Sequence, residues 1–509
     1  MFPAGEPNKE ALFTMEFCST RDRSLRVTSA RAILQGLSEE GGLFVPVELP
    51  SFSRETIMTM AAMDYRQVAE TVLARFLPDY TAEELHEYVS QAYAAQFDDP
   101  QIAPVKAIRP GAWSLELWHG PTCAFKDFAL QMLPRLLPAA AKKCGVDKEV
   151  AILTATSGDT GKAALEGFSD VPGTKICVFY PHGGTSRMQA LQMMTQTGSN
   201  VNVFAVKGNF DDTQSGVKAI FTDSAAAKEL SDRGILLSSA NSINWGRLAP
   251  QVAYYFWSYA QLLKSGSIRM GDEISFCVPT GNFGDILAGY LAKKSGLPVS
   301  KLICASNENN VLTQFINAGV YDRNRDFHLT ASPSMDILIS SNLERLLFLL
   351  CGDDEKVRTW MDQLKKTGKY DVGSEMVQKL RDEGFVAYWC DDRHTAFTIR
   401  DTWHGRNYLC DTHTGVAVNA LQQHAALTGD KTPAVVVSTA SPFKFAQSIL
   451  PAIGIDFQGD DFQLLEALEI VSGQKAPAAL KELKGKPVRF ESVIEKNEMK
   501  QAVLHWLED

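Results

Sequence analysis

The stretch that decides the fold reads Val150-Ala151-Ile152-Leu153-Thr154-Ala155-Thr156-Ser157-Gly158-Asp159-Thr160-Gly161-Lys162-Ala163-Ala164. It begins with a short apolar run, passes through a polar turn that contains two glycines, and continues with a helical pattern. A short apolar run without polar alternation is typical of a parallel strand that is buried on both faces. The stretch therefore predicts a buried strand followed at once by a helix.

The same pattern repeats through the rest of the chain. Further strands are expected at residues 175–180, 201–206, 235–238, 274–278, 301–305 and 434–437, and helices at residues 161–168, 186–197, 213–230, 245–263 and 285–294. This alternation predicts an α/β fold with mostly parallel sheets flanked by helices. Because the first four strands crowd into residues 150–238, we expect two open, twisted sheets in two domains, with a ligand cleft between them.

The start of the chain has a different pattern and predicts a mainly helical domain at residues 1–98. Apolar residues recur at helical spacing over residues 64–77 and 81–96, with Thr81 as the N-cap and Glu84 at the capping-box position of the second helix. We expect a small α/β domain at residues 149–252. A large α/β domain would then join residues 99–148 to residues 253–509.

The composition excludes several classes of protein. The net charge of −10 argues against a nucleic-acid surface, because phosphate binders usually carry a basic excess. Residues 1–10 lack the pattern of a secretory signal, and no apolar run is long enough for a membrane span. The nine scattered cysteines suit reduced thiols, and the nine histidines show no ligand spacing. We expect a cytoplasmic protein without a structural metal.

One lysine is set among aromatic and small residues just before the first predicted strand. The stretch reads Leu117-Trp118-His119-Gly120-Pro121-Thr122-Cys123-Ala124-Phe125-Lys126-Asp127-Phe128. Flanking Phe125 and Phe128 would partly desolvate the amine of Lys126, which favours a neutral, nucleophilic lysine able to form a Schiff base. The alternative is an amphipathic lysine whose stem packs on the rings while its amine reaches water.

Two strand-to-helix turns are suited to anions. At Thr156, Ser157, Gly158, Asp159 and Thr160, hydroxyls and the N-terminus of a helix can hold a carboxylate or phosphate, unless Asp159 simply caps the helix. At Gly281, Asn282, Phe283, Gly284 and Asp285, the glycines let the backbone approach a bound group and form a nest for a phosphate. The second turn is neither a dinucleotide fingerprint nor a P-loop, and it can also be a glycine turn without a ligand.

Two further polar segments complete the set. A buried strand ends at Ser438 and Thr439, where a neutral hydroxyl can bond a ring nitrogen, although Ser441 and Pro442 also read as a helix start. The turn from Ser239 to Arg247 offers the amides of Asn241 and Asn244, the hydroxyl of Ser242 and a guanidinium that matches phosphate. By itself this turn can also be a capped helix with a surface arginine.

Together these segments match the chemical groups of one cofactor. Pyridoxal 5′-phosphate has an aldehyde for Lys126, a phosphate for Gly281 to Asp285, and a pyridine nitrogen for a hydroxyl such as that of Thr439.

The motifs also resemble those of a known family, the threonine synthases, which are pyridoxal-phosphate enzymes of the tryptophan-synthase-β-like fold (fold type II). The resemblance covers nearly the whole chain. It rests on Ser19-Thr20-Arg21, Gly41-Gly42-Leu43-Phe44-Val45-Pro46, His119-Gly120-Pro121-Thr122, Lys126-Asp127-Phe128, Thr156-Ser157-Gly158-Asp159-Thr160-Gly161, Asn241-Ser242-Ile243-Asn244-Trp245, Arg247, Gly281-Asn282-Phe283-Gly284-Asp285, Ser334-Met335-Asp336 and Ser438-Thr439-Ala440-Ser441.

The resemblance implies a PLP-dependent lyase that converts O-phospho-L-homoserine and water to L-threonine and phosphate by γ-elimination and β-hydration. Lys126 would hold the cofactor and move protons, the turn at 156–160 would bind the substrate carboxylate, and Asn241, Ser242, Asn244 and Arg247 its phosphate. A phospholyase or amino-acid dehydratase on the same fold, releasing an oxo acid, is the alternative. The resemblance also suggests a monomer. Lys162 and Asp22 depart from the family pattern, and Lys162 would either strengthen an anion site or point outwards.

Overall fold

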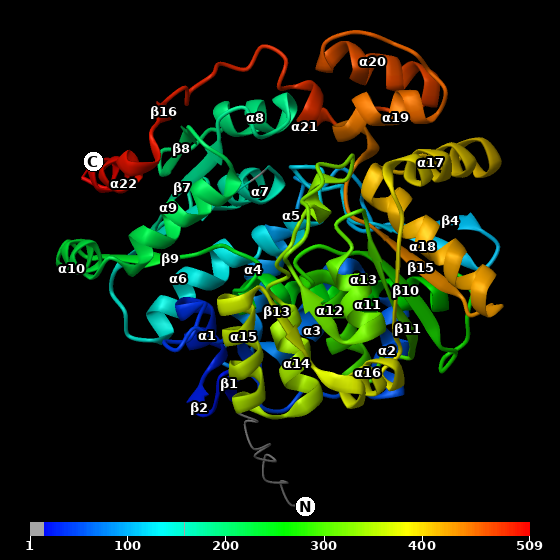
Figure 1. Ribbon diagram of the computed structural model, residues 1–509, viewed down its shortest axis with the longest axis horizontal. Coiled ribbons are helices and arrows are strands. Elements are labelled where there is room, and N and C mark those ends of the chain that lie inside the picture. The colour runs from blue at the N-terminus through cyan, green and yellow to red at the C-terminus, as the bar shows by residue number, and fades with distance from the viewer. Residues whose placement is uncertain (1–14, 157, 509) are drawn as a thin grey trace, which may run out of the picture.

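The computed structural model describes residues 15–156 and 158–508 (Figure 1). Its first part is mainly helical, with a small antiparallel sheet of order β2-β1-β3. Thr81 caps α4 and forms a capping box with Glu84, which confirms the predicted start of that helix. The elements of this part are β1 (Phe17–Ser19), β2 (Asp22–Val27), α1 (Ser29–Gln35), β3 (Phe44–Pro46), α2 (Arg54–Thr59), η1 (Met60–Ala62), α3 (Tyr65–Phe76) and α4 (Ala82–Ala92).

A six-stranded sheet of order β14-β11-β10-β15-β5-β4 is the centre of the large α/β part. Its strands are parallel except β4, which pairs antiparallel with β5 at one edge. Along β10, Phe276 and Val278 face one hydrophobic cluster and Cys277 the opposite one, so the strand is buried on both faces, as the apolar pattern predicted. The strands are β4 (Val105–Arg109), β5 (Ala112–Glu116), β10 (Ile274–Pro279), β11 (Val299–Ser306), β14 (Phe385–Trp389) and β15 (Ala434–Ser438).

Helices cover both faces of this sheet. On one face α18 packs against β10, β11 and β15, and on the other α11 packs against α12. The helices of this part are α5 (Lys126–Leu130), α6 (Leu133–Lys143), α11 (Trp245–Lys264), α12 (Gly284–Lys294), α13 (Val311–Ala318), η2 (Pro333–Met335), α14 (Leu343–Cys351), α15 (Asp354–Thr367), α16 (Gly373–Asp382), α17 (Asp392–Arg406), α18 (Thr412–Thr428), η3 (Pro442–Phe445), α19 (Ala446–Ala452), α20 (Asp461–Ser472) and α21 (Ala478–Lys481). A two-stranded antiparallel sheet of β12 (Val320–Asp322) and β13 (Lys369–Asp371) also belongs to it.

The second, five-stranded sheet has the order β16-β8-β7-β6-β9, and all its pairs are parallel. Strand β16 comes from the C-terminal part of the chain, which runs from α20 and α21 across to the small sheet (Figure 1). The elements are β6 (Glu149–Ala155), α7 (Asp159–Phe168), β7 (Thr174–Pro181), α8 (Arg187–Met194), β8 (Val201–Val206), α9 (Phe210–Thr222), α10 (Ser224–Asp232), β9 (Ile235–Ser238), β16 (Val493–Ile494), η4 (Lys496–Glu498) and α22 (Met499–Trp506).

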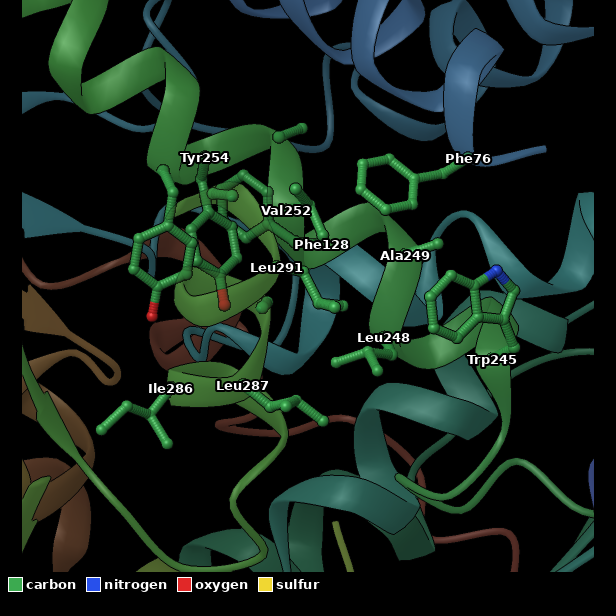
Figure 2. Packing of buried hydrophobic residues seen from close by; sticks show 14 of the residues in the cluster. Phe76, Phe128, Trp245, Leu248, Ala249, Val252, Tyr254, Ile286, Leu287 and Leu291 are labelled. Atoms are coloured by element: carbon green, nitrogen blue, oxygen red, sulfur yellow. The ribbon is translucent and has the colours of Figure 1, made fainter. Parts of the chain in front are cut away.

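Helix α11 ties these parts together. Trp245 at its start and Tyr254 in its middle are fully buried, and they lie in one cluster with Phe76 from α3 and Phe128 from α5 (Figure 2). Burial of each such large side chain contributes about 1.5–3 kcal/mol to folding. This cluster packs the N-terminal part against α11 and against α5, the helix that begins at Lys126.

The observed architecture confirms the predicted fold class of two mostly parallel sheets flanked by helices, with a mainly helical N-terminal part. One predicted helix, over residues 213–230, is wrong. Asp223 has an extended backbone and caps α10, which breaks the segment into α9 and α10. No helix of residues 15–156 and 158–508 is long and apolar enough to cross a membrane.

Candidate active site

Lys126 lies at the first residue of α5, in a turn fixed beside the end of β15. An isolated bridge joins Ala124 to Ala440, and the Phe125 N–H donates to the Thr439 carbonyl at 2.8 Å. The Ser441 N–H donates to the Cys123 carbonyl at 3.1 Å. These backbone bonds place the lysine next to Thr439 at the carboxyl ends of the large sheet, where ligands of α/β proteins usually bind.

The amine of Lys126 is largely withdrawn from water. Its Nζ is 3.5 Å from Ser334 Oγ, 3.9 Å from Asp159 Oδ2 and 5.0 Å from the ring centre of Phe125, and its side chain is 13% exposed. Burial lowers the pKa of Lys126 to about 8, although the Asp159 carboxylate acts in the opposite direction. A useful fraction of the amine is therefore neutral near pH 7 to 8.

The expected aromatic flank is only half correct. Phe125 lies beside the amine, whereas the ring of Phe128 packs into the core against Tyr65, Tyr93 and Tyr254. Because residues two apart face different sides of a helix, Phe128 points to the buried side of α5, away from the Lys126 amine. The desolvation of Lys126 therefore comes from the burial of its side chain among several elements and not from Phe128.

Asp127 ties the turn before the lysine. The N–H and hydroxyl of Thr122 donate to its two carboxylate oxygens at 2.8 and 2.6 Å. A Cβ at Gly120 would come within 2.5 Å of this carboxylate, so the glycine is required by packing. Burial raises the pKa of Asp127 to about 6. Asp127 therefore shapes the turn, and its oxygens are already occupied.

The turn after β6 closes on itself around Thr156. Its Oγ1 accepts from the N–H groups of Gly158 and Gly161, both at 3.0 Å. Thr160 is half-buried and its hydroxyl has no partner in the described part of the chain, whereas Ser157 lies outside the described residues. The side chain of Lys162 turns away from the site to Glu166, at 2.9 Å, and to Gln196.

Asp159 does more than cap this turn. Its carboxylate is buried, accepts from Lys444 Nζ at 2.6 Å and Gln189 Nε2 at 2.9 Å, and lies 3.4 Å from Ser334 Oγ. Burial alone would raise its pKa, but Lys444 and Lys126 hold the pKa of Asp159 well below its usual range. This turn of the small sheet is thus joined to the large part next to Lys126.

The glycine turn after β10 approaches the same point. A Cβ at Gly281 would lie 2.7 Å from the carbonyl oxygen of Ser334, whose hydroxyl faces Lys126. Phe283 has a left-handed backbone with φ of 63°, and α12 begins after it without a side-chain cap. Asn282 is exposed, and its carbonyl accepts from Asn342. The free N–H groups at the start of α12 suit a phosphate.

Asp285 lies in the first turn of α12. Its Oδ1 accepts from the hydroxyls of Tyr254 and Tyr255 at 2.6 and 2.8 Å, and its Oδ2 is buried without a partner in the described residues. Burial raises the pKa of Asp285 to about 6, while Lys126 lowers it. The carboxyl of Asp285 is thus held by two tyrosines and lies within the electrostatic influence of Lys126.

The turn before α11 contains one polar side chain that is bonded within the protein and two that are not. The amide of Asn244 is fully used, because its Oδ1 accepts from the Gly246 N–H at 2.8 Å and its Nδ2 donates to the Ile33 carbonyl at 2.9 Å. Asn241 and Ser242 are half-buried, and neither side chain has a partner in the described part of the chain. Asn244 thus positions the turn, and its neighbours carry the open polar groups.

Arg247 is a buried cation that has no carboxylate partner among the described residues. It is 3% exposed, its Nη1 donates to the Ala240 carbonyl at 2.5 Å, and its Nε has no partner in the described residues. Burial lowers the pKa of Arg247 to about 10, and its charge lowers the pKa of Lys126. An unpaired buried guanidinium is costly unless an anion completes it.

Three residues of the site were not assigned roles from the sequence. Ser334 contacts Lys126, and its N–H donates to His413 Nε2 at 3.1 Å. His413 is oriented in turn by Asp411, 2.6 Å from its Nδ1. Lys444 bonds both Asp159 and the Thr122 carbonyl. Only Ser334 had a signal, the Ser-Met-Asp motif, because the other two reach the site through long-range packing.

The capping role of Asn244 has a measurable consequence. Replacement of Asn244 by alanine is expected to lower the free energy of unfolding by about 2 kcal/mol, because the cap of α11 and the bond to α1 are both lost. Urea unfolding followed by circular dichroism measures this. Asn241→Ala, whose amide makes no bond in the described protein, should cost less than about 0.5 kcal/mol. Equal losses in the two variants would contradict the assignment.

Comparisons with known proteins agree with this geometry. Three family models match the chain: "Threonine synthase N terminus" over residues 16–93, "Pyridoxal-phosphate dependent enzyme" over residues 109–440, and "Threonine synthase, C-terminal" over residues 414–503. A threonine synthase from Pseudomonas aeruginosa is 39% identical over 86% of this chain and 90% of its own length.

Two further relatives differ in how much of their length is matched. Human "Threonine synthase-like 1" is 40% identical over 84% of this chain, but the chain spans only 58% of that protein. The crystal structure of PLP-bound threonine synthase from Brucella melitensis superposes with a TM-score of 0.85 and 36% identity, covering 96% of this chain and 99% of the other.

Proposed function

The chain belongs to the threonine synthase family of pyridoxal-phosphate-dependent enzymes, and from this premise we propose that it converts O-phospho-L-homoserine and water to L-threonine and phosphate. The observation that carries the proposal is a desolvated Lys126 amine beside the small-sheet turn at Asp159, together with a buried Arg247 that has no carboxylate partner in the described residues and whose charge acts on Lys126. A substrate with both an amino-acid carboxylate and a phosphate matches those two sites.

The cofactor is pyridoxal 5′-phosphate, and the residues present fit it. Gly281 leaves no room for a side chain beside Ser334, and the uncapped start of α12 can accept the cofactor phosphate. The hydroxyl of Thr439 has no partner in the described residues and lies beside the lysine turn, where it can bond the ring nitrogen. We propose Lys126, Gly281, Asn282, Phe283, Gly284, Asp285 and Thr439 as the cofactor-binding residues.

When bound, the cofactor supplies an aldehyde for the lysine and a ring that accepts electrons from the α carbon of the substrate. Lys126 Nζ then moves the protons: it removes one from the α carbon and one from the β carbon, and returns protons at the γ and α carbons after phosphate leaves and water adds. A neutral hydroxyl at Thr439 does not keep the ring nitrogen protonated, so it makes the ring a milder electron acceptor.

The substrate is held at its two charged ends. We propose that the turn of Thr156, Ser157, Gly158, Asp159 and Thr160 holds its carboxylate at the start of α7. Thr156 fixes the turn through its bonds to Gly158 and Gly161, the hydroxyl of Thr160 is available as a donor, and Lys444 neutralises the charge of Asp159. Asn241, Ser242 and Arg247 hold the substrate phosphate, and Asn244 contributes by fixing their turn. Two fixed ends orient the α and γ carbons toward Lys126.

Incubation of the purified protein with O-phospho-L-homoserine tests this function. We expect L-threonine and inorganic phosphate in equal amounts, both measured in the same reaction by chromatography and a phosphate assay. A phospholyase would give 2-oxobutyrate and phosphate without threonine, and that result would overturn the proposal. The Lys126→Ala variant is the control for contaminating activity.

The domain boundaries, oligomeric state, location and partner of the protein remain predictions. We propose the same three units, with residues 493–506 joined to the small α/β domain because β16 pairs with β8 and α22 packs on α9. The monomeric state and the cytoplasmic location are to be checked by light scattering and by cell fractionation. A substrate that is a small molecule, without nucleic acid or membrane, remains the expected partner.

A further inference from the structure

A second lysine is buried beside the first. The side chain of Lys444, in η3, is 1% exposed, and its Nζ is 2.6 Å from Asp159 Oδ1 and 3.0 Å from the Thr122 carbonyl oxygen. The other oxygen of Asp159 is 3.9 Å from Lys126 Nζ. One carboxylate is thus shared unequally by two lysines, and the shorter contact goes to Lys444.

This unequal sharing has a chemical effect on Lys126. A full ion pair with Asp159 would stabilise the ammonium form of Lys126, which neither attacks an aldehyde nor accepts a proton. By taking Oδ1 at hydrogen-bond distance, Lys444 leaves Lys126 only a longer contact. The positive charge of Lys444 also repels the ammonium directly.

The same contact affects the turn proposed to hold a carboxylate. An unneutralised Asp159 in this turn would repel an anionic substrate group, and Lys444 cancels its charge. Through the Thr122 carbonyl, Lys444 also links this turn of the small sheet to the turn that carries Lys126. Lys444 therefore neutralises the Asp159 carboxylate, favours binding of the substrate carboxylate and weakens the ion pair between Asp159 and Lys126.

We propose that Lys444 is a positioning residue, which holds the Asp159 carboxylate away from Lys126 so that the Lys126 amine remains reactive. The proposal rests on the proposed role of Lys126 as the cofactor lysine. The charged groups that face Lys126 are Asp159 on α7, Lys444 on η3, Arg247 on α11, Asp127 on α5 and Asp285 on α12. Of the two cations among them, only Lys444 is paired with a carboxylate in the described residues.

The test follows the reaction of Lys126 with pyridoxal phosphate as a function of pH. Full-length protein freed of cofactor is mixed with pyridoxal phosphate, reduced with borohydride after a fixed short time, and the adduct at Lys126 is quantified by peptide mass spectrometry. The rate follows the neutral fraction of the amine, so the wild type should show a midpoint near the Lys126 pKa of about 8. Lys444→Met should move the midpoint upward by about one pH unit or more, which makes the reaction at pH 7 about tenfold slower.

The chain offers a matched control in Lys162, another buried lysine paired with a carboxylate but facing Glu166. Lys162→Met should leave the midpoint unchanged. The double variant Lys444→Met with Asp159→Asn should return it to the wild-type value or below, because the competing carboxylate is gone.

The outcomes separate the two proposals. A wild type that forms no adduct at Lys126 overturns the cofactor-lysine assignment itself. An unchanged midpoint in Lys444→Met, or equal shifts in Lys444→Met and Lys162→Met, overturns the role of Lys444. Should Lys444→Met not fold, Lys444→Arg must keep the wild-type midpoint and Asp159→Asn must lower it, and a rise in either variant contradicts the proposal.

Discussion

Replacement of Lys126 by alanine should lower kcat/KM for O-phospho-L-homoserine by about 10⁴-fold, the upper range for loss of one acid–base group. The loss is large because the same amine binds the cofactor and moves each proton, and no other amine in the described residues is so placed. Lys444, the nearest alternative, is fixed in an ion pair with Asp159. Steady-state phosphate release and threonine formation measure the effect.

Two controls make the Lys126 result specific. The variant should keep the circular dichroism and melting midpoint of the cofactor-free wild type, because the one hydrogen bond of the Lys126 side chain in the described residues is long, 3.5 Å to Ser334. After borohydride reduction it should carry no cofactor, while Lys162→Met carries the wild-type amount. A Lys126→Ala protein with wild-type cofactor attachment would show that another lysine forms the bond.

Replacement of Arg247 by methionine should reduce kcat/KM by about 10²- to 10³-fold, mainly through a higher KM. Loss of a desolvated, charge-assisted contact costs about 2–5 kcal/mol, and each 1.4 kcal/mol corresponds to tenfold in affinity. The side chain makes one bond within the protein, to the Ala240 carbonyl, so most of its donors are available to the substrate phosphate. Initial rates over a range of substrate concentrations give kcat and KM separately.

The specificity of the Arg247 effect can be checked with ligands that lack one group. Inhibition by inorganic phosphate should weaken in parallel with KM, whereas binding of L-serine, which has no phosphate, should change by about threefold at most. Arg247→Lys should recover part of the loss, because it keeps the charge but not the planar fork. Equal weakening of serine and phosphate would place Arg247 at the carboxylate end instead.

The strands that the sequence predicted best are those buried on both faces. The strands Ile274–Pro279 and Ala434–Ser438, whose residues are all buried, were each predicted to within one residue. The edge strand β4 was missed because several of its residues face solvent and break the apolar pattern. Strand β16 has two residues and leaves no pattern at all. Strands β5 and β14 were also not predicted, although four of the five residues of β5 are buried. In β5 the polar residues Ser114 and Glu116 interrupt the apolar pattern, so burial alone does not make a strand predictable.

The candidate site was predictable to the extent that its residues stand at ends of strands. The segments with Lys126, Thr156 and Gly281 each follow a strand and converge through Ser334 and Asp159. Lys444 was not predictable, because Ser-Pro-Phe-Lys also reads as an ordinary helix start and its partner is 285 residues away. The double use of Asn244 was hidden for the same reason, since Ile33 lies in the N-terminal part.

The pairing of β16 with β8 also sets an order of events during synthesis. The two strands are separated by more than half of the chain, so the outer edge of the small sheet is complete only when β16 has been made. At roughly 5–20 residues per second, the backbone of β8 stays unpaired on that side for about 15–60 seconds. During this interval a nascent chain exposes an unpaired parallel edge, which other chains can pair with until β16 has emerged from the ribosome.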